Sequence, residues 1–387
     1  MPLIATNCIN GKDLYPSYET TRFVSAETYK TWFRGHPKPG DILFVCKGSP
    51  GRTNWVPDPV DFCIAQDMVA VRANPKKVYP KYLFAVLRSH IVQSQIDNMH
   101  VGTMIPHFKK GDFDKLNIPL LDSGSQVAVG DLYFELSQRI TLLRETNATL
   151  EAIAQALFKS WFVDFDPVRA KMEGRTPEGM DEATAALFPD GFETSELGEV
   201  PRGWQPIRLD SFLELAYGKA LKAENRKPGL VPVYGSGGVT GWHDTPLIDS
   251  PSIIVGRKGT VGSLYWESRP FYPIDTVFYV KAKRPLTYCH QLLKTLGLDG
   301  MNTDAAVPGL NRENVYRLLV PDVPAEMLAA FDTSASALRD SIDHNEAQAQ
   351  TLSVLRDTLL PRLISGQLRL SEAQAAAEAA LGGALQA

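Results

Sequence analysis

The chain repeats one arrangement of residues at an interval of about 200 positions, and this repeat restricts its possible folds more than any other feature. Residues 103–119 (TMIPHFKKGDFDKLNIP) match residues 305–321 (AAVPGLNRENVYRLLVP) at a shift of 202 positions. The same shift continues without a gap through the apolar stretch that follows, where it pairs Ile140 with Ile342. A period of this length is the size of a domain with its connector, so we expect two copies of one module.

The match extends upstream with small changes of register. The matched segments are 62–71 with 271–280, 47–51 with 258–262, and 2–11 with 232–241. Before the second copy stand roughly 27 residues, 204–231, with strand-like segments at 206–209 and 212–215. The first copy has only Met1 before it, so we interpret it as a module that lacks its opening strands because it is truncated. The alternative is a module that never had them.

Composition favours a soluble protein that makes no disulfides. No run of about 18 apolar residues exists, and the segment 1–6 lacks both a basic start and a sustained apolar stretch, so we expect a cytoplasmic protein without a membrane segment. The four cysteines have no Cys-x-x-Cys spacing. Buried free thiols therefore explain Cys8, Cys46, Cys63 and Cys289 better than a disulfide framework or a zinc site.

Charge is distributed unevenly around a net value of −4. Residues 1–124 carry +4 and residues 204–324 carry +3, whereas residues 166–203 carry −5. This is the sign expected if each module contacts phosphate while the connectors contact protein. Differences of this size are also compatible with random scatter.

Short β-branched and aromatic runs, punctuated by glycine and proline, predict a strand-rich module with a helix at 80–88 and its counterpart at 288–296. The period then changes to alternating steps of three and four residues, which is typical of a long coiled-coil helix. A helix over 125–162 would be about 57 Å long, too long to bury its apolar stripe against its own small module. The predicted helix-pair residues are Ile140, Leu143, Asn147, Leu150, Leu157, Trp161, Ile342, Asn345, Leu352, Leu355, Leu359 and Leu363.

The simplest partner for each stripe is the other stripe. Direct repeats with nearly two-fold pairing would make the pair antiparallel, with Asn147 and Asn345 at core-type positions where a polar residue fixes the register. Packing of each helix on a separate subunit is the alternative. The fold class we predict is α+β, with two pseudo-repeated mixed α/β modules separated by two long helices that form an antiparallel coiled coil.

No pattern of catalytic residues is found in the sequence. Asp/Glu-x-Lys of a metal-dependent nuclease and the Asn/Asp-Pro-Pro-aromatic turn of an amino-methyltransferase are both missing, and residues 256–262 match neither a Rossmann nor a Walker motif. The seven histidines have no metal-site spacing. The two copies share glycines, prolines and apolar positions but differ in polar loops, as expected of a recognition protein.

Three further stretches carry a resemblance to a known family: Leu157–Arg175, Ser195–Trp204 and Leu359–Leu368. In these and in its whole organisation the chain resembles the specificity subunits of Type I restriction-modification enzymes. The resemblance implies a non-catalytic subunit with two target-recognition domains, each reading one half of a bipartite site in double-stranded DNA. It also implies that the helices recruit two methyltransferase subunits and, through them, the restriction/translocase subunits. S-adenosylmethionine, ATP and Mg would then belong to these partners, with no cofactor in this chain.

The resulting domain boundaries are 1–121 for the first recognition domain, 122–165 for the first helix, 166–203 for a linker, 204–323 for the second recognition domain, 324–370 for the second helix and 371–387 for a flexible tail. Base readout needs Arg, Lys, Asn or Gln side chains, and phosphate contacts need basic groups. The expected DNA contacts flank the repeated glycine turns and the equivalent loops: Lys47, Arg52, Lys109, Lys110, Arg257, Lys258, Asn311 and Arg312.

A helix of about 57 Å limits the separation of the half-sites to roughly 17 base pairs at 3.4 Å each. Two other functions remain open from the sequence. One is a coiled-coil adaptor with two ligand-binding modules and no role at DNA, and the other is a solitary regulatory or antitoxin-like DNA binder.

Overall fold

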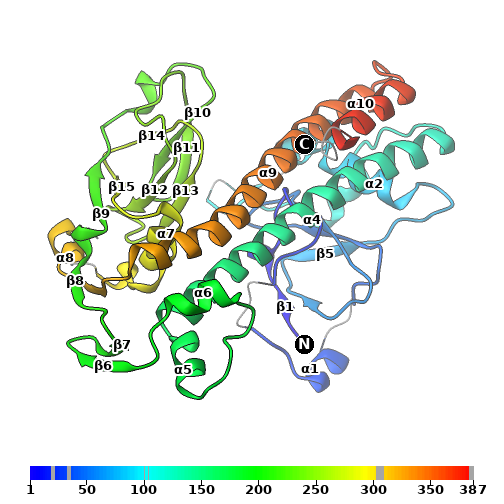
Figure 1. The fold of residues 1–387 in the computed structure, drawn as a ribbon. Coiled ribbons are helices and arrows are strands. Elements are labelled where there is room, and N and C mark those ends of the chain that lie inside the picture. The colour runs from blue at the N-terminus through cyan, green and yellow to red at the C-terminus, as the bar shows by residue number, and fades with distance from the viewer. Residues whose placement is uncertain (19–21, 33–35, 100, 103, 302–308, 383–387) are drawn as a thin grey trace. The chain divides into compact units, whose positions relative to one another are not determined.

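The computed structural model describes the chain except for residues 19–21, 33–35, 100, 103, 302–308 and 383–387. The chain forms two compact units: unit 1 comprises Met1–Asn147 and His344–Ala387, and unit 2 comprises Ala148–Asp343. Two 40-residue helices, α4 (Ser123–Phe162) and α9 (Ala325–Ile364), contribute to both units (Figure 1). Each unit therefore contains one repeated module together with one part of each long helix.

The module of unit 2 is built on an antiparallel four-stranded sheet in the order β13-β12-β15-β9. A smaller sheet has the order β11-β10-β14, and β8 pairs with β16. The strands are β8 (Pro206–Arg208), β9 (Leu213–Tyr217), β10 (Val231–Gly235), β11 (Gly238–His243), β12 (Ser252–Gly256), β13 (Leu264–Glu267), β14 (Tyr272–Pro273), β15 (Val277–Ala282) and β16 (Leu319–Pro321). The helices are α7 (Leu286–Thr295), α8 (Arg312–Tyr316) and the 3-10 turns η3 (Leu209–Ser211), η4 (Ala223–Asn225) and η5 (Leu298–Gly300).

The module of unit 1 has a smaller set of strands. A three-stranded antiparallel sheet has the order β3-β2-β5, and β1 pairs in parallel with β4. The strands are β1 (Leu3–Ile4), β2 (Ile42–Val45), β3 (Thr53–Trp55), β4 (Cys63–Ile64) and β5 (Met68–Val71). The helices are α1 (Ala26–Thr31), α2 (Pro80–Arg88), α3 (His90–Met99) and the 3-10 turns η1 (Thr6–Cys8) and η2 (Lys110–Lys115).

Strand registers confirm that the two modules are copies of one fold. In unit 1 the parallel pair places Leu3 opposite Cys63, and in unit 2 the matched residues Val233 and Tyr272 are opposite each other. The antiparallel pairs repeat in the same way, with Ile42 opposite Trp55 and Ile253 opposite Trp266. The predicted helices 80–88 and 288–296 correspond to α2 and α7.

The modules differ at β8 and β9. β8 lies in the predicted strand-like segment 206–209, and β9 overlaps the predicted segment 212–215 and continues to Tyr217. The described residues of unit 1 contain no counterpart of either strand. In unit 2, β9 covers the outer edge of β15 and β8 pairs with β16. Among the described residues of unit 1, β5 pairs only with β2, and residues 117–119, which match β16, are not in a strand.

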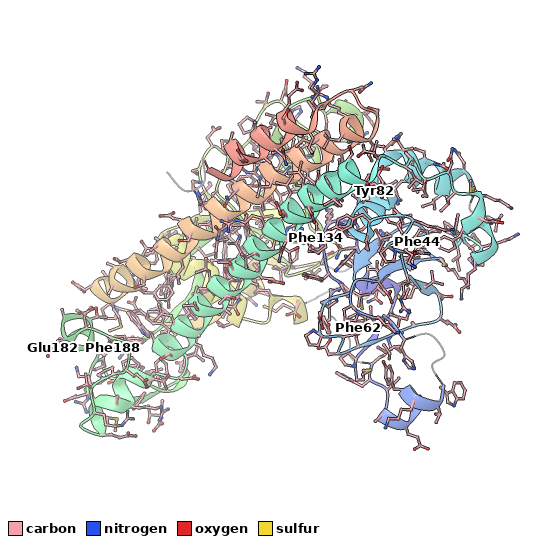
Figure 2. All side chains as sticks on the ribbon, turned by 90° about the vertical axis from the view of Figure 1, so that its right-hand side faces the viewer. Phe44, Phe62, Tyr82, Phe134, Glu182 and Phe188 are labelled. Atoms are coloured by element: carbon pink, nitrogen blue, oxygen red, sulfur yellow. The ribbon has the colours of Figure 1, made fainter. Side chains whose placement is uncertain are left out.

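The core of unit 1 brings its sheet and α2 together with α4 and α9. Phe44 of β2, Tyr82 of α2 and Phe134 of α4 are buried in one cluster, which also holds Leu359 and Leu363 of α9 (Figure 2). Gly130 lets α4 approach α2, because a Cβ there would stand 2.6 Å from the main-chain nitrogen of Tyr82. The expectation that the helix cannot use its own module as a partner is therefore wrong at this end: α4 packs on the module and on α9 together.

The core of unit 2 uses the opposite ends of the same helices. Phe158 and Phe162 of α4 and Phe331 of α9 pack around Tyr288 of α7, with ring centroids 5.1–6.2 Å apart. The apolar residues Leu213, Leu215, Phe278 and Val280 of the sheet belong to the same cluster.

The segment predicted as a linker, 166–203, is folded. It contains α5 (Asp166–Met172), α6 (Glu182–Leu187) and a hairpin of β6 (Phe192–Ser195) and β7 (Gly198–Pro201). Phe188 is 2% exposed and packs edge-on against Trp161 at 5.3 Å. Proline, glycine and acidic residues suggested a linker, but buried apolar residues spaced between them, such as Phe188, attach the segment to the core of unit 2.

The predicted flexible tail is likewise helical over most of its length. Helix α10 spans Leu370–Gly382, and its Ala373 and Ala377 are 0% and 3% exposed. Ala377 packs with Leu136 and Leu352 of the long helices. Two alanines four residues apart lie on the same face of α10, and their small side chains let this helix pack closely on the other two. The sequence pattern gave no sign of this contact, because the face contains no large apolar residue.

All four cysteines are buried and free, as predicted. Among the residues that the structure describes, no helix is long and apolar enough to cross a membrane. The same residues contain no group of three or more His, Cys, Asp or Glu side chains arranged to hold a metal ion.

Candidate nucleic-acid interface and helix pair

The repeated Lys-Gly-x-x-Gly segment of unit 1 is a tight turn between β2 and β3. Val45 donates its N–H to the carbonyl of Arg52 at 2.9 Å, and Gly51 donates back to the carbonyl of Val45 at 3.0 Å. Gly48 and Gly51 have φ values of 90° and 89°, in the left-handed region that favours glycine. This requirement explains why both copies keep glycine at these positions.

A second loop is attached to this turn by main-chain hydrogen bonds. The N–H of Phe108 donates to the carbonyl of Cys46 at 2.8 Å, and that of Gly48 donates to the carbonyl of Pro106 at 2.9 Å. Lys47 and His107 form a β-bridge beside them. The turn and the loop therefore form one continuous surface, although about 60 residues separate them in the sequence.

Unit 2 repeats these main-chain contacts at the matched positions. Gly256 donates to the carbonyl of Ser263 at 2.8 Å, and Gly262 donates to the carbonyl of Gly256 at 2.9 Å. Leu310 donates to the carbonyl of Arg257 at 2.8 Å. Lys258 and Gly309 form the bridge that corresponds to Lys47 and His107. The two surfaces thus share one main-chain frame but carry different side chains.

Six of the eight predicted DNA-contact residues lie on these turns and loops, and the other two, Lys110 and Arg312, begin η2 and α8 directly after the loops. In unit 1 the side chains of Lys47, Arg52, Lys109 and Lys110 are exposed. The described structure holds no ion pair for any of the four within 4.0 Å, so their charges are available to a ligand.

In unit 2 two of the predicted arginines are held in place by an aromatic ring. The guanidinium carbons of Arg257 and Arg312 each lie 5.1 Å from the ring centroid of Tyr217, a distance typical of cation–π contacts. Arg257 also donates to the carbonyl of Asp275 at 3.2 Å, and Arg312 is 3.5 Å from the carboxylate of Glu313. Two positive charges are therefore fixed beside one ring of β9.

Lys258 and Asn311 have different surroundings. The side chain of Lys258 is exposed on the glycine turn. The side-chain oxygen of Asn311 accepts the N–H groups of Glu313 and Asn314 at 2.9 and 3.3 Å and so caps α8. Asn311 has a structural task that the sequence prediction did not assign to it, and its amide oxygen is committed to the helix.

Such a surface suits a polyanion. Exposed lysines and arginines contact phosphate oxygens without regard to sequence, while oriented arginines can donate two hydrogen bonds to one guanine. The main-chain frame keeps these groups in position without using their side chains. The side chains can therefore differ between the modules, as recognition of two different sequences would require.

The second candidate surface is the helix pair. In unit 1, Asn345 donates its amide N–H to the side-chain oxygen of Asn147 at 2.8 Å. Ile140 and Leu143 of α4 pack with Ala349 and Leu352 of α9. Farther toward the start of α4, Val129 and Tyr133 pack with Leu359 and Leu363. Positions rise along α4 as they fall along α9, so the helices are antiparallel, as predicted. The two asparagines predicted at core-type positions are hydrogen-bonded to each other.

Unit 2 continues the antiparallel pairing, but the buried face of α4 is displaced. Ala154, Phe158 and Trp161 are buried there, while the predicted Leu150 and Leu157 are half-buried. A straight helix drifts by about 20° per heptad relative to a strict seven-residue repeat, so the buried face turns by about 40–60° over two or three heptads. Among the predicted residues of α9, Ile342 is buried in unit 2, Leu352, Leu359 and Leu363 are buried in unit 1, and Leu355 is half-buried.

A polar cluster that the sequence did not reveal joins α7 to α4 in unit 2. Glu151 accepts hydrogen bonds from Gln291, at 2.9 Å, and from Lys294. Burial opposes ionisation of Glu151, but these hydrogen bonds and the charge of Lys294 outweigh it and lower its pKa. Burial, with a smaller contribution from Lys294, lowers the pKa of the neighbouring His290 to about 3.

Tyr217 is the other residue that the prediction missed. It belongs to a strand that the first copy does not match, so comparison of the repeats could not find it. The alternating apolar and polar residues of Leu213–Tyr217 could have indicated that Tyr217 ends a strand beside the glycine turn.

Several known proteins are similar to this chain along most of its length. The specificity subunit of the Type I restriction enzyme HindI from Haemophilus influenzae is 26% identical, over 86% of this chain and 87% of that protein. The specificity subunit of the Type I restriction enzyme MjaIX from Methanocaldococcus jannaschii is 22% identical, over 79% of this chain and 76% of that protein. The fold is similar to the crystal structure of a Type-I restriction-modification system S subunit from M. genitalium, with a TM-score of 0.52, 20% identity, and coverage of 92% and 90% of the two chains.

A family profile described as the Type I restriction modification DNA specificity domain matches two stretches of the chain, residues 5–152 and 201–307. The first stretch covers the first module and much of α4, and the second begins shortly before β8 and covers most of the second module. Together they cover more than half of the sequence. The chain therefore belongs to the Type I restriction modification DNA specificity domain family.

Proposed function

We propose that this chain is the DNA sequence-recognition subunit of a Type I restriction-modification complex and has no catalytic role of its own. The observation that carries the proposal is the pair of matching turn-and-loop surfaces, which share main-chain hydrogen bonds but present different basic side chains. Two such readers on one chain suit a bipartite site in double-stranded DNA. Membership of the specificity-domain family supports the same role.

Within this proposal the turns and loops contact DNA. Exposed Lys47, Arg52, Lys109 and Lys110 would bind phosphate in unit 1, and Lys258 would do so in unit 2. Arg257 and Arg312 are the better candidates for base readout, because Tyr217 restricts their motion. A positioned guanidinium loses less conformational entropy when it binds a base than a free one does.

The helix pair would recruit the partner subunits. Its long helices keep apolar side chains exposed that the fold does not use, including Leu142 and Ile153 of α4, which are 50% and 48% exposed. We propose that two methyltransferase subunits bind such surfaces and that the restriction/translocase subunits join through them. S-adenosylmethionine, ATP and Mg would be bound by these partners, and a cytoplasmic location follows from access to DNA.

The decisive experiment is methylome sequencing of cells that co-express this chain with its methyltransferase. A split, adenine-methylated motif is the expected result, and it would supply both half-sites. The sequence-based limit of roughly 17 base pairs between them is tested at the same time. Gel-shift assays with and without the methyltransferase separate this role from that of an adaptor without DNA or a DNA binder that acts alone.

The contact assignment is tested by Lys258→Glu, with Lys281→Glu as the matched control. Lys258 lies beside Thr276, to whose carbonyl its N–H donates at 3.1 Å. Lys281 is exposed on β15 five residues farther along, about 16 Å away for an extended strand. Loss of a phosphate contact should weaken binding of DNA of any sequence and reduce the slope of log K against log salt by about 1. Equal effects of the two substitutions would disprove a specific role for Lys258.

A further inference from the structure

The ring of Tyr217, the last residue of β9, has a fixed orientation in unit 2 and is still half open. Tyr217 lies opposite Phe278 of β15 in the strand register, and the two rings pack edge-on with centroids 5.0 Å apart. The side chain of Tyr217 is nevertheless 51% exposed. About half of this side chain can therefore contact a ligand while the rest is held by the sheet.

Two arginines from different segments of the module lie beside this ring. The guanidinium carbons of Arg257, which follows β12, and Arg312, which begins α8, are each 5.1 Å from the ring centroid of Tyr217. Arg257 is also 5.8 Å from the ring centroid of Phe278. Arg312 is also 5.6 Å from that of Tyr316. Contacts with two rings restrict each side chain, so both guanidinium groups are positioned before a ligand binds.

These two cations have little negative charge beside them. The side chain of Arg257 donates to the main-chain carbonyl of Asp275 at 3.2 Å, and the described residues form no ion pair with it within 4.0 Å. Arg312 is 3.5 Å from the carboxylate of Glu313, which is 60% exposed. A guanidinium has five N–H donors, so most of those of Arg257 remain for a ligand. The pair therefore favours a ligand with several hydrogen-bond acceptors.

The distance between the two arginines suits one short DNA sequence. Two guanidinium carbons that are each 5.1 Å from the same centroid are at most 10.2 Å apart. Three base-pair steps of DNA span about this length, at about 3.4 Å each. Arg257 and Arg312 can therefore both reach bases of one half-site.

Guanine fits this arrangement better than phosphate does. In the major groove guanine presents two acceptors, N7 and O6, and an arginine that donates to both is the commonest base-specific contact. A phosphate contact requires only a basic group, which the exposed Lys258 on the same turn already supplies. Two guanidinium groups held by aromatic rings add a fixed orientation, which base readout requires and phosphate binding does not.

We propose that Tyr217 is a positioning residue that presents Arg257 and Arg312 to guanine bases in the half-site that unit 2 reads. The inference rests on the proposed function in DNA recognition, and it adds the base that is read and the residue that fixes the readers. In unit 1, Cys46 and Lys110 stand at the positions that match the two arginines, and Cys46 is buried. Guanine readout by this arrangement is therefore confined to one half-site.

The first test is the methylome of cells that co-express the methyltransferase with the unsubstituted chain, with Tyr217→Leu or with Tyr217→Phe. We expect the unsubstituted motif to contain at least one G·C pair in one half-site. Tyr217→Leu removes the aromatic ring and should make that pair degenerate while the other half-site stays unchanged. Tyr217→Phe keeps the ring and should keep the motif. A merely structural role would instead reduce methylation of the whole motif without changing its sequence.

The second test replaces the guanine of that pair by 7-deazaguanine, which lacks the N7 acceptor, in gel-shift assays with the methyltransferase present. The unsubstituted chain should lose affinity roughly tenfold, because a bidentate contact becomes a single hydrogen bond. Tyr217→Leu should lose much less, because its arginines are no longer held at the base. If Tyr217→Leu fails to fold, Arg257→Lys takes its place, since lysine keeps the charge but lacks the planar guanidinium.

Three results would overturn the proposal and leave the role in DNA recognition intact. The first is a split motif without a G·C pair in either half-site, and the second is equal affinity of the unsubstituted chain for guanine and 7-deazaguanine. The third is a Tyr217→Leu variant that binds all sequences more weakly with a salt slope reduced by about 1, since the arginines would then contact phosphate. If the unsubstituted chain gives no split motif and binds no DNA, the proposed function fails and this inference fails with it.

Discussion

Leu352 holds the three helices of unit 1 together, and its replacement by alanine should weaken that unit strongly. The side chain is 0% exposed and packs against Leu136, Ile140 and Leu143 of α4 and Ala377 of α10. Loss of three carbon atoms costs about 2.4 kcal/mol at about 0.8 kcal/mol per buried methylene. The gap adds to this, because residues from three helices cannot all move in to fill it. We therefore expect Leu352→Ala to lower the free energy of unfolding by about 3–4 kcal/mol.

The matched control for this change is Val354→Ala, two residues away on the same helix. Val354 is 55% exposed, so its truncation should change stability by no more than about 0.5 kcal/mol. The chain has two compact units, so native-state hydrogen exchange is the suitable assay, because it reports on peptides from each unit separately. A loss below about 1 kcal/mol in unit 1, or equal losses in the two variants, would refute the packing of α4, α9 and α10 described above.

Three other substitutions test separate contacts. Ala377→Glu places a charge in the interface of α10 and should release that helix, seen as faster hydrogen exchange, whereas Ala375→Glu on its exposed face should not. Glu267 is 5% exposed; burial raises its pKa, but hydrogen bonds from Arg269 and Tyr234 outweigh this and lower it. Its ionised form thus stabilises the fold above the ordinary Glu pKa, so Glu267→Gln should cost about 1–3 kcal/mol at neutral pH, and urea denaturation should show the difference shrinking below about pH 4.5. The pKa of His290 is lowered to about 3 in the folded chain. Between about pH 6.5 and that value the unfolded chain binds a proton at this histidine and the folded chain does not, so acid destabilises the fold. Between about pH 6 and 4 this histidine should lower the free energy of unfolding by up to about 1.4 kcal/mol per pH unit, and His290→Gln should abolish that contribution. An unchanged slope of unfolding free energy against pH would refute the assignment.

The sequence predicted those parts of the fold that are determined by local pattern or by the repeat. The long helices followed from apolar spacing. Their antiparallel pairing followed from the direct repeat, because two direct repeats that pair with near two-fold symmetry must place their helices antiparallel. Strand positions such as β2 and β12 followed from β-branched runs between glycine turns. The residues 166–203 and α10 were predicted wrongly, because their attachment depends on a few small or aromatic side chains whose partners are distant in the sequence.

The candidate site was predictable in place but not in detail. Repeated glycines located both turns, since φ values near +90° favour glycine in either copy. The role of Asn311 as a helix cap and the contact of Tyr217 with two arginines depend on tertiary structure that one copy alone possesses. Comparison of the two copies could not supply them.

The repeated surface also explains how one duplicated fold can hold two different specificities. In both units, main-chain N–H and carbonyl groups hold the turn and its loop, as in the hydrogen bonds from Phe108 to Cys46 and from Leu310 to Arg257. Substitution of an outward side chain leaves these bonds intact, so His107 in one copy can stand where Gly309 stands in the other. Selection on recognition can then act on the side chains with little cost in stability, since exposed substitutions usually change it by less than about 0.5 kcal/mol. The outward side chains of the turns proposed to contact DNA are thus the positions where the sequence can diverge most freely, while the left-handed backbone beneath them favours glycine.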